Sequence, residues 1–419
     1  MESIAWFREL NQNDTRVAGG KGANLGELTA AGFNVPPGFV VTAPAYLAAM
    51  QAAGVREMLA HAIDGLDPDD TTELSRRANE SAGLVRKAAL TPDIRAAITG
   101  AFNQIVDRDN ATWFAVRSSA TAEDTAGTSF AGMNKTFTNV AGADGILDAV
   151  VECWASLFAE RVLAYRSVNQ LFEEPAIAVI VQEMVDSERS GVIFTADPAT
   201  GDRTRMLIEA AWGQGEVIVS GQVEPDSYVV DPARNTIISV HQGTQREQIR
   251  RDEHGVERRI PVSTQQANQR VLDDEEVLAV ARLAAAIAAH YGQPQDVEWA
   301  MADTATYIVQ SRPITTIKPT STPASTLPDD RVLLRGLGAS AGTATGRVRV
   351  LHSPAQGGFL QPGEVLVGHH DEPRLGSRAA SRRGRDYRRR GAHLSRCHRQ
   401  PRTSGPVCSG SQNRHRRPA

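Results

Sequence analysis

The sequence divides at about residue 373 into an acidic body and a basic tail that are unlike in composition and are not expected to share one core. Residues 374–419 contain fourteen Arg, no Lys and a single acidic residue, Asp386. The preceding 373 residues contain 31 Lys and Arg against 48 Asp and Glu, so a body of net charge −17 precedes a tail of net charge +13. A natural basic arm normally mixes Lys with Arg. Arginine alone, without hydrophobic periodicity, is typical of GC-rich DNA translated in the wrong frame, and we predict that the tail is disordered.

The acidic body has the composition of a globular protein. Hydrophobic residues make up 41% of the chain and aromatic residues 5%, so we expect a core built mainly from Ala, Val, Leu and Ile. Cys153 is the one cysteine before the tail, which argues against a disulfide scaffold and favours the cytoplasm. No apolar run approaches the roughly 20 residues that span a bilayer, and the first residues do not have the pattern of a signal peptide. The acidity of the body argues against nucleic acid as its partner.

Hydrophobic periodicity predicts a mixed α+β (α/β) class, and 419 residues leave room for two or three domains. Predicted helices are Tyr46–Leu59, Leu147–Ala164 and a strongly amphipathic Asp273–His290. Predicted strands are Val35–Thr42, Thr112–Val116, Ala176–Glu183, Gly191–Phe194, Met206–Glu209, Ser227–Val230 and Thr306–Gln310. A linker rich in Pro, Thr and Ser at 318–330 separates a domain at 1–317 from a partial domain at 331–373. The partial domain has predicted strands Val332–Leu337, Gly346–Leu351 and Glu364–Gly368.

The first cluster that could carry chemistry is GGKGANLGEL at residues 19–28, with four Gly around Lys21. Glycines let backbone N–H groups approach an anion, Lys21 adds a point charge, and a helix N-terminus follows. The cluster is not a Walker A loop, because no Ser or Thr follows the Lys at the required place. The alternative is an ordinary glycine turn that caps a helix.

The second cluster begins at Arg117, at the end of a predicted strand. Ser118 and Ser119 follow it, and the glycine-containing SFAGM lies at 129–133. An Arg beside a hydroxyl-rich loop suits bidentate contact with phosphate. The alternative is a surface ion pair, which is the commoner setting of a single Arg.

The third cluster places two acids, an amide and an arginine on neighbouring strands. Asp296 and Glu298 are two residues apart, so on a strand both carboxylates point to the same side. Gln310 and Arg312 repeat this spacing after the turn Met301–Ala305. Mg²⁺ prefers oxygen ligands and phosphate oxygens, so the cluster could hold Mg²⁺ with a triphosphate. The alternative is the exposed, charged face of a hairpin.

Together the clusters resemble the ATP-binding region of phosphoenolpyruvate synthase (pyruvate, water dikinase) and its dikinase relatives. The resemblance covers residues 1 to about 317 through seven blocks in the family's order: GGKGANLGEL, VPPGFVVT, FAVRSSATAED, SFAGM, SGVIFTADPATGDR, SGQVEPDSY and DVEWA…YIVQSRP. It implies an ATP-grasp fold that binds ATP and Mg²⁺.

The resemblance also implies roles for single residues. Lys21 and Arg117 would hold the ATP phosphates, and Arg312 would stabilise charge on the transferring phosphoryl group. The loop over the nucleotide would include Gly132 and Thr136, and adenine would be contacted by Gln182, Glu183 and Val185. The magnesium site would comprise Glu298, Gln310 and Asp296.

After the linker, Leu334–Gly342 and the segments at 346–350 and 363–367 resemble the start of the family's swivelling phosphohistidine domain. In that family a His in a TCHAAI-type motif accepts phosphate from ATP and carries it to a pyruvate-binding domain, and the motif is absent here. When the codons of Asp386–Gln400 are shifted by one base, they can encode ITDGGG followed by TCHAAIV. We therefore interpret residues 374–419 as out-of-frame sequence, with the join near Glu372–Pro373.

The sequence thus predicts a phosphoenolpyruvate synthase-like chain that binds Mg·ATP. The family forms phosphoenolpyruvate, AMP and phosphate from pyruvate, ATP and water, which we do not expect of this chain alone. A separate downstream polypeptide could supply the missing parts. Alternatives are a non-catalytic ATP-binding remnant of a decayed gene and an enzyme like pyruvate, phosphate dikinase or an antibiotic phosphotransferase. Two further alternatives make the tail a nucleic-acid tether or a metal site of Cys397, His398, Cys408 and His415.

Overall fold

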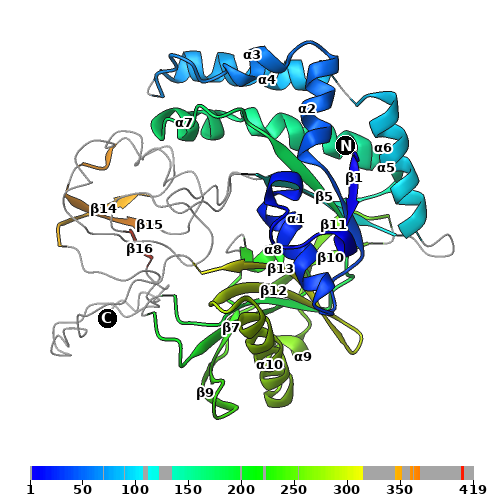
Figure 1. Ribbon diagram of the computed structural model, residues 1–419. Coiled ribbons are helices and arrows are strands. Elements are labelled where there is room, and N and C mark those ends of the chain that lie inside the picture. The colour runs from blue at the N-terminus through cyan, green and yellow to red at the C-terminus, as the bar shows by residue number, and fades with distance from the viewer. Residues whose placement is uncertain are drawn as a thin grey trace. The chain divides into compact units, whose positions relative to one another are not determined.

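Two antiparallel sheets form the framework of the first unit of the chain, which comprises Met1–Ala196 and Arg203–Ile314 (Figure 1). The second unit comprises Asp197–Asp202 and Thr315–Ala419. The computed structural model describes residues 2–68, 70–88, 90–106, 112–121, 135–198, 201–219, 223–252, 254–314, 345–351, 359–361, 363–368 and 407–409. The mixed α+β class predicted from the sequence is confirmed, with an ATP-grasp-like first unit.

The first sheet has five strands in the order β1-β2-β5-β3-β4. Their bounds are β1 Ile4–Trp6, β2 Gly38–Val41, β3 Phe114–Ala120, β4 Thr136–Val140 and β5 Ile177–Glu183. The central strand β5 is buried on both faces, which explains its continuous apolar run. Val179 and Val181 lie in one hydrophobic cluster, and Ala178 and Ile180 lie in another on the opposite face.

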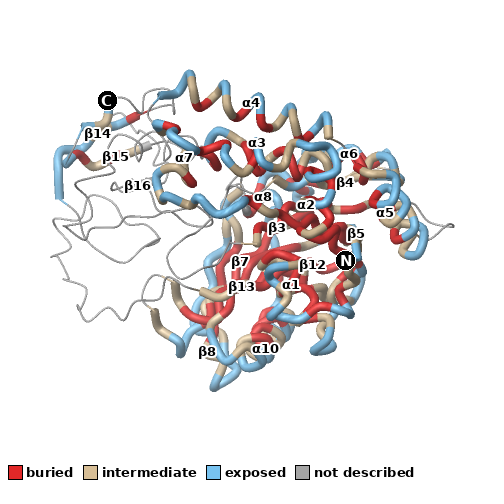
Figure 2. Tube along the Cα trace, turned by 45° about the horizontal axis from the view of Figure 1, so that its top comes forward, coloured by how far each residue is buried: buried red, intermediate tan, exposed pale blue. Residues whose placement is uncertain are grey.

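Helices cover both faces of this sheet. Helix α1 (Thr15–Ala30) packs on the face of Ala178 and Ile180 through Ala18 and Leu25. The other helices of this part of the chain are α2 Ala43–Ala52, α3 Arg56–Ala60, α4 Thr71–Ala88, α5 Pro92–Ile105, α6 Gly142–Ala155 and α7 Glu160–Val168, with 3₁₀ turns at Phe7–Glu9 and Ser156–Phe158. Residues of α2 to α7 form the hydrophobic cluster on the face opposite α1. In Figure 2 the red buried positions follow the strands and the inner sides of these helices.

Two predictions of a continuous helix are wrong, because each of the two segments is divided in the structure. The segment Tyr46–Leu59 forms the end of α2 and most of α3, with Gly54 at φ 68° between them. The segment Leu147–Ala164 is interrupted at Ala159, which is extended (φ −61°, ψ 145°). Hydrophobic periodicity records which side of a helix is buried, and it does not detect a single residue that leaves the helical conformation.

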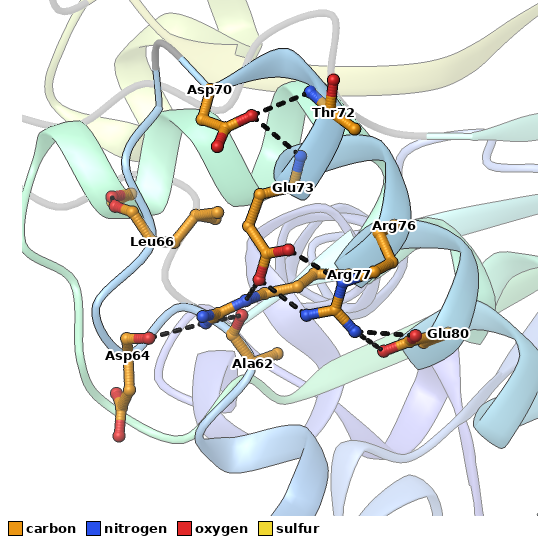
Figure 3. A network of polar contacts seen from close by, with 10 residues as sticks. Ala62, Asp64, Leu66, Asp70, Thr72, Glu73, Arg76, Arg77 and Glu80 are labelled. Carbon is orange, nitrogen blue, oxygen red and sulfur yellow. Dashed lines mark hydrogen bonds and ion pairs between the residues drawn. The ribbon is translucent and has the colours of Figure 1, made fainter.

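Helix α4 is held by a surface network of charged side chains (Figure 3). Asp70 accepts hydrogen bonds from the backbone N–H groups of Thr72 and Glu73 at its N-terminus. Arg77 bonds to Glu73 and donates to the carbonyl oxygen of Asp64, which anchors the loop before the helix. Exposed ion pairs contribute little to stability, so the network orients the loop rather than stabilising the core.

The second sheet has six strands in the order β13-β12-β6-β7-β8-β9. Their bounds are β6 Arg189–Phe194, β7 Met206–Trp212, β8 Asp226–Asp231, β9 Thr236–His241, β12 Gln295–Ala302 and β13 Ala305–Pro313. Helix α10 (Asp274–Tyr291) packs on one face through a cluster that includes Val277 and Val297. Its N-cap Asp273 forms a capping box with Glu276, and Gly292 ends it at φ 65°. The predicted helix Asp273–His290 is therefore confirmed.

The remaining described elements are small. A separate hairpin consists of β10 (Glu247–Arg251) and β11 (Glu257–Pro261), and α8 (Glu216–Val219) and α9 (Thr264–Ala267) are single turns. In the second unit β14 (Arg347–Leu351), β15 (Glu364–Gly368) and β16 (Val407–Ser409) form a parallel sheet. Within the described residues, no helix is both long and apolar enough to cross a membrane.

The second unit tests some of the sequence predictions. The predicted strands Gly346–Leu351 and Glu364–Gly368 are confirmed by β14 and β15. In the tail, Val407–Ser409 form a strand where we predicted disorder, because their backbone pairs with β15. The linker 318–330, the predicted strand Val332–Leu337 and the other tail residues lie outside the described residues.

Candidate functional site

The glycine cluster lies at a kink in α1, directly against β3. Gly19 has φ 67° and ψ 170°, which interrupts the helix between Thr15 and Ala30. A Cβ atom at Gly19 would lie 2.3 Å from both the carbonyl oxygen and Oγ of Ser119, so only glycine fits. Nζ of Lys21 donates to the carbonyl oxygen of Ser118 at 3.5 Å. The glycine turn that we gave as the alternative is thus present, and it is also the start of the resumed helix. It holds Lys21 beside β3, the strand of the second cluster.

Arg117 lies on the face of the five-stranded sheet that α1 covers. Residues opposite one another in a sheet share a face, and Arg117 is opposite Ile180, which packs against α1. Its guanidinium reaches the second sheet, where Nη1 donates to the carbonyl oxygen of Val309 at 3.1 Å and Nη2 donates to Oε1 of Gln310. Nη1 also lies 3.4 Å from Oε1 of Gln182 on β5. Arg117 thus connects the two sheets.

A β-bulge in β13 accounts for the contact with Val309. Glu298 is opposite Gln310, whereas the next residue of β12, Trp299, is opposite Ile308. Val309 is the extra residue of this bulge, and an extra residue is left out of the ladder of paired strands. Its carbonyl oxygen accepts a hydrogen bond from Arg117.

The third cluster has the arrangement that its spacing predicts. Asp296 lies opposite Arg312, and Glu298 lies opposite Gln310. Val297 packs in the cluster with α10, so its neighbours Asp296 and Glu298 point to the other face of the sheet. That is the face on which Arg117 meets Gln310. The structure therefore brings the second and third clusters together.

Asp296 and Arg312 form an ion pair that sequence reasoning missed. Nε and Nη2 of Arg312 each lie 2.8 Å from Oδ2 of Asp296. Asp296 is only 5% exposed, and its Oδ1 atom is buried without a hydrogen-bond partner among the described residues. A buried carboxylate oxygen normally has a partner. In the sequence, Asp296 and Glu298 have the same spacing as Gln310 and Arg312. This equal spacing does not reveal which residues lie opposite one another on the two strands.

Asp296, Glu298 and Gln310 carry oxygen atoms of the type that Mg²⁺ binds together with phosphate. In the described part of the chain, no group of three or more His, Cys, Asp and Glu side chains could hold a metal by itself. Mg²⁺ is commonly bound by one or two carboxylates and completed by water and substrate phosphates. The buried Oδ1 of Asp296 is an acceptor suited to such an ion.

These residues also fall in a region that matches known proteins. Residues 15–330 match the family described as pyruvate phosphate dikinase, AMP/ATP-binding domain. The chain belongs to this family. A probable phosphoenolpyruvate synthase of Methanothermobacter thermautotrophicus is 43% identical over 368 residues, which is 87% of this chain and 53% of that protein. The phosphoenolpyruvate synthase of Pyrococcus furiosus is 38% identical over 413 residues, with 87% of this chain and 50% of that protein covered.

A relative of another kind also matches this chain. The rifampicin phosphotransferase of Streptomyces sviceus is 37% identical over 315 residues, which is 75% of this chain and 36% of that protein. The chain spans about half the length of the two phosphoenolpyruvate synthases and about a third of the phosphotransferase.

In the AMP/ATP-binding domain, β5 ends beside the residues expected to contact adenine. Gln182 is 2% exposed, and its Nε2 lies 3.4 Å from the carbonyl oxygen of Pro36. The backbone N–H of Glu183 donates to Pro37 at 2.9 Å, so this N–H is already occupied. The N–H of Val185 makes no such bond among the described residues, which leaves it as the backbone donor of this segment.

Of the two residues expected in the loop over the nucleotide, Thr136 and Gly132, the structure describes only the first. Thr136 is exposed on β4, opposite Arg117. Gly132 lies outside the described residues.

The hairpin β10–β11 contributes contacts near the end of β5 that sequence reasoning missed. Glu257 accepts hydrogen bonds from Thr138 and from Asn139, which has φ 54°. The backbone N–H of Asn139 also donates to Sδ of Met184 at 2.9 Å. Strand β4 is thereby bonded both to the hairpin and to the segment that follows β5. No charge pattern in the sequence connects residues so far apart.

Helix α1 is also tied to α10 of the AMP/ATP-binding domain. Oε1 of Glu27 lies 2.7 Å from Nε2 of His290, and the hydroxyl of Tyr291 donates to the carbonyl oxygen of Asn24 at 3.2 Å. The N–H of Gln12 donates to Oε2 of Glu27 and holds the pKa of this carboxyl below its ordinary value. His290 acts in the same direction, against the opposing effect of burial. The helix that carries Lys21 is therefore fixed to both sheets.

Proposed function

We propose that this AMP/ATP-binding domain binds Mg·ATP between its two sheets and supports phosphoryl transfer of the phosphoenolpyruvate synthase type. The observation that carries the proposal is the position of Arg117, which lies on the face covered by the Lys21 helix and bonds to Gln310 beside the acids of β12. Three cationic side chains and two carboxylates from distant parts of the sequence thus adjoin one interface between sheets. Such an arrangement suits a triphosphate with its cation.

In this proposal the three cations neutralise the phosphates. Lys21 is a point charge at a helix start, where backbone N–H groups also favour anions. Arg117 and Arg312 each present a planar fork of donors that matches phosphate oxygens. Arg312 would stabilise the charge that develops on the transferring phosphoryl group, since such reactions depend mainly on positioning and electrostatic stabilisation. Asp296 orients Arg312 through the ion pair described above.

Glu298, Gln310 and Asp296 would hold the magnesium ion, which supplies further neutralisation of the phosphates when bound. The nucleotide base would lie at the end of β5, near Gln182, Glu183 and Val185. We propose that the base bonds to the N–H of Val185, because the N–H of Glu183 is occupied by Pro37. Thr136 and Gly132 would lie over the nucleotide.

By itself the chain is proposed to bind Mg·ATP without completing the transfer to pyruvate. The sequence contains no phosphohistidine motif of the TCHAAI type in frame, and formation of phosphoenolpyruvate from pyruvate needs an acceptor for the phosphoryl group. We further propose that a separate polypeptide carries the acceptor and the pyruvate site. We also propose that the chain acts in the cytoplasm.

Two other functions are supported by particular observations. The likeness to the Streptomyces rifampicin phosphotransferase supports an antibiotic as the acceptor. The Arg-rich composition of residues 374–419, which we interpret as out-of-frame sequence, supports a remnant that binds ATP without catalysis.

Thermal melting tests the proposal directly, because a ligand that binds the folded state raises the melting temperature. We expect ATP with Mg²⁺ to raise the melting temperature, and pyruvate or rifampicin alone to leave it unchanged. A parallel assay with ATP, Mg²⁺ and pyruvate should release no phosphoenolpyruvate. Release of phosphoenolpyruvate by the purified chain would show that it is a complete enzyme. Formation of phosphorylated rifampicin, when rifampicin replaces pyruvate in the assay, would favour the antibiotic branch.

A further inference from the structure

We infer that Ser119 is a positioning residue for Lys21, because it supplies from β3 the N-terminal cap that the kinked helix α1 lacks. The inference rests on the proposed function, since Lys21 matters only if the domain binds a nucleotide. It adds a residue that is not among those expected to touch the ligand.

The kink creates a new helix N-terminus within α1. Gly19 leaves the helical conformation, and the helix resumes from Gly20 to Ala30. The first N–H groups of any helix have no intrahelical acceptor. An N-cap side chain of Ser, Thr, Asp or Asn normally accepts a hydrogen bond from the second or third helical residue. Here the cap position is Gly19, which has no side chain.

Ser119 provides the missing acceptor from a distant part of the sequence. Its Oγ accepts a hydrogen bond from the N–H of Gly22 at 3.2 Å, across 97 residues of sequence. Counted from the cap at Gly19, Gly22 is the third helical residue, which is a position that an N-cap side chain serves. Ser119 is 0% exposed, so water does not replace this acceptor. The bond is therefore the capping interaction of the resumed helix.

The close packing explains why the cap comes from β3. A Cβ atom at Gly19 would lie 2.3 Å from Oγ of Ser119, so no side chain at position 19 can provide a cap. A Cβ atom at Gly22 would lie 3.0 Å from the Cβ of Ala18 and 3.1 Å from a methyl group of Val40. The helix start is in direct contact with the sheet, and the sheet supplies the acceptor.

Lys21 lies between the two glycines that Ser119 contacts. Its Nζ donates to the carbonyl oxygen of Ser118, so consecutive residues of β3 hold the backbone and the side chain of this turn. The residue before them, Arg117, is the second proposed phosphate ligand. Three successive residues of one strand thus set the position of both cations relative to each other.

The test compares Ser119→Ala with Ser167→Ala. The hydroxyl of Ser167 donates to the carbonyl oxygen of Leu66 at 2.7 Å across 101 residues, so it is a matched hydrogen bond far from α1 in sequence and on another helix. Hydrogen exchange without nucleotide reports the cap, and calorimetry with Mg·ATP reports the position of Lys21. Both variants are also prepared in the Lys21→Ala background, and thermal melting shows which of them are folded.

We expect Ser119→Ala to speed hydrogen exchange of the Gly22 amide. We also expect it to weaken Mg·ATP binding about tenfold. A tenfold change corresponds to about 1.4 kcal/mol, which is of the size that loss of an N-cap costs. Ser167→Ala should change neither quantity. In the Lys21→Ala background, Ser119→Ala should weaken binding less than twofold further, because its effect acts through Lys21.

Several results would overturn the inference. Unchanged exchange at Gly22 in Ser119→Ala would show that Ser119 is not the cap. Equal weakening with and without Lys21 would show a general structural effect rather than positioning. If wild-type protein fails to bind Mg·ATP while the Gly22 exchange behaves as expected, the proposed function fails and the positioning role fails with it, although the cap is real.

Discussion

The guanidinium of Arg117 on β3 donates a hydrogen bond to the carbonyl oxygen of Val309 on β13 at 3.1 Å. The two residues are 192 positions apart, and the bond joins the two sheets of the AMP/ATP-binding domain. It exists because a bulge leaves Val309 out of the strand ladder. We therefore expect the position of Arg117, the proposed phosphate-binding residue, to depend on the arrangement of the two sheets.

Substitution of Arg117 should remove most nucleotide affinity. We expect Arg117→Ala to weaken Mg·ATP binding about a hundredfold, since charged hydrogen bonds contribute up to about 3 kcal/mol. Arg117→Lys should recover only part of this loss, because Lys lacks the planar fork. Arg95→Ala, at an exposed position of α5, is the control. Wild-type affinity in Arg117→Ala would contradict the proposed site.

Removal of Lys21 should weaken ATP binding and reduce its dependence on salt. Lys21→Ala removes one positive charge from the triphosphate site, and ionic contacts weaken as salt increases. Fluorescence titration with a labelled ATP analogue at low and high salt measures both effects. Lys87→Ala, at the exposed end of α4, should bind as wild type does. An equal loss in both lysine variants would indicate a nonspecific effect of charge.

Glu298→Gln should reduce the contribution of Mg²⁺ to binding. The amide keeps the size and polarity of the side chain but loses the negative charge that attracts the ion. Titration of Mg²⁺ at fixed ATP should show a weaker apparent affinity for the metal. Glu57→Gln on α3 is a matched control at an exposed position. Unchanged magnesium dependence in Glu298→Gln would remove Glu298 from the metal site.

Gly19→Ala should destabilise the protein much more than Gly54→Ala. Both glycines have left-handed backbone, with φ 67° and φ 68°, so alanine is strained at either position. A Cβ atom at Gly54 has no neighbour within 4 Å, whereas at Gly19 it overlaps Ser119. Gly54→Ala should cost about 1 kcal/mol and Gly19→Ala at least about 2 kcal/mol more, as measured by thermal melting. Equal melting temperatures would show that α1 moves away from β3 without cost.

The Glu27 carboxyl should stabilise the fold in a pH-dependent way. Its folded-state pKa is lowered from 4.5, chiefly by the N–H of Gln12. A group with a lowered pKa contributes stability that is fully present above the unfolded-state value and is lost as pH falls through the folded-state value. The difference in melting temperature between wild type and Glu27→Gln should therefore be larger at pH 6 than at pH 3. A difference that stays constant over this range would contradict the assignment.

The parts of the site that follow from local periodicity were predicted correctly. Asp296 and Glu298 share a face because side chains alternate along a strand. The helix start that we predicted after Lys21 lies before it instead, since α1 begins at Thr15 and resumes at Gly20 after the kink. The helix Asp273–His290 was predictable because its capping residues and apolar face are consecutive in the sequence.

The contacts between distant segments could not be predicted. The bulge at Val309 and the pairing of Asp296 with Arg312 depend on strand register, which is set by packing of the whole sheet. The bond from Glu183 to Pro37 depends on how β2 and β5 align. The sequence predicts Ser119 only as part of a hydroxyl-rich loop, whereas it lies on β3 and its partner Gly22 is 97 residues away.

Calorimetry of ATP binding to the folded chain at low salt, with Mg²⁺ present and then chelated, is the most direct test of the central claim. We predict saturable uptake of about one ATP per chain with Mg²⁺, and a marked loss of affinity when the metal is removed. Well-folded protein that takes up no adenosine nucleotide in a magnesium-dependent way would contradict the account.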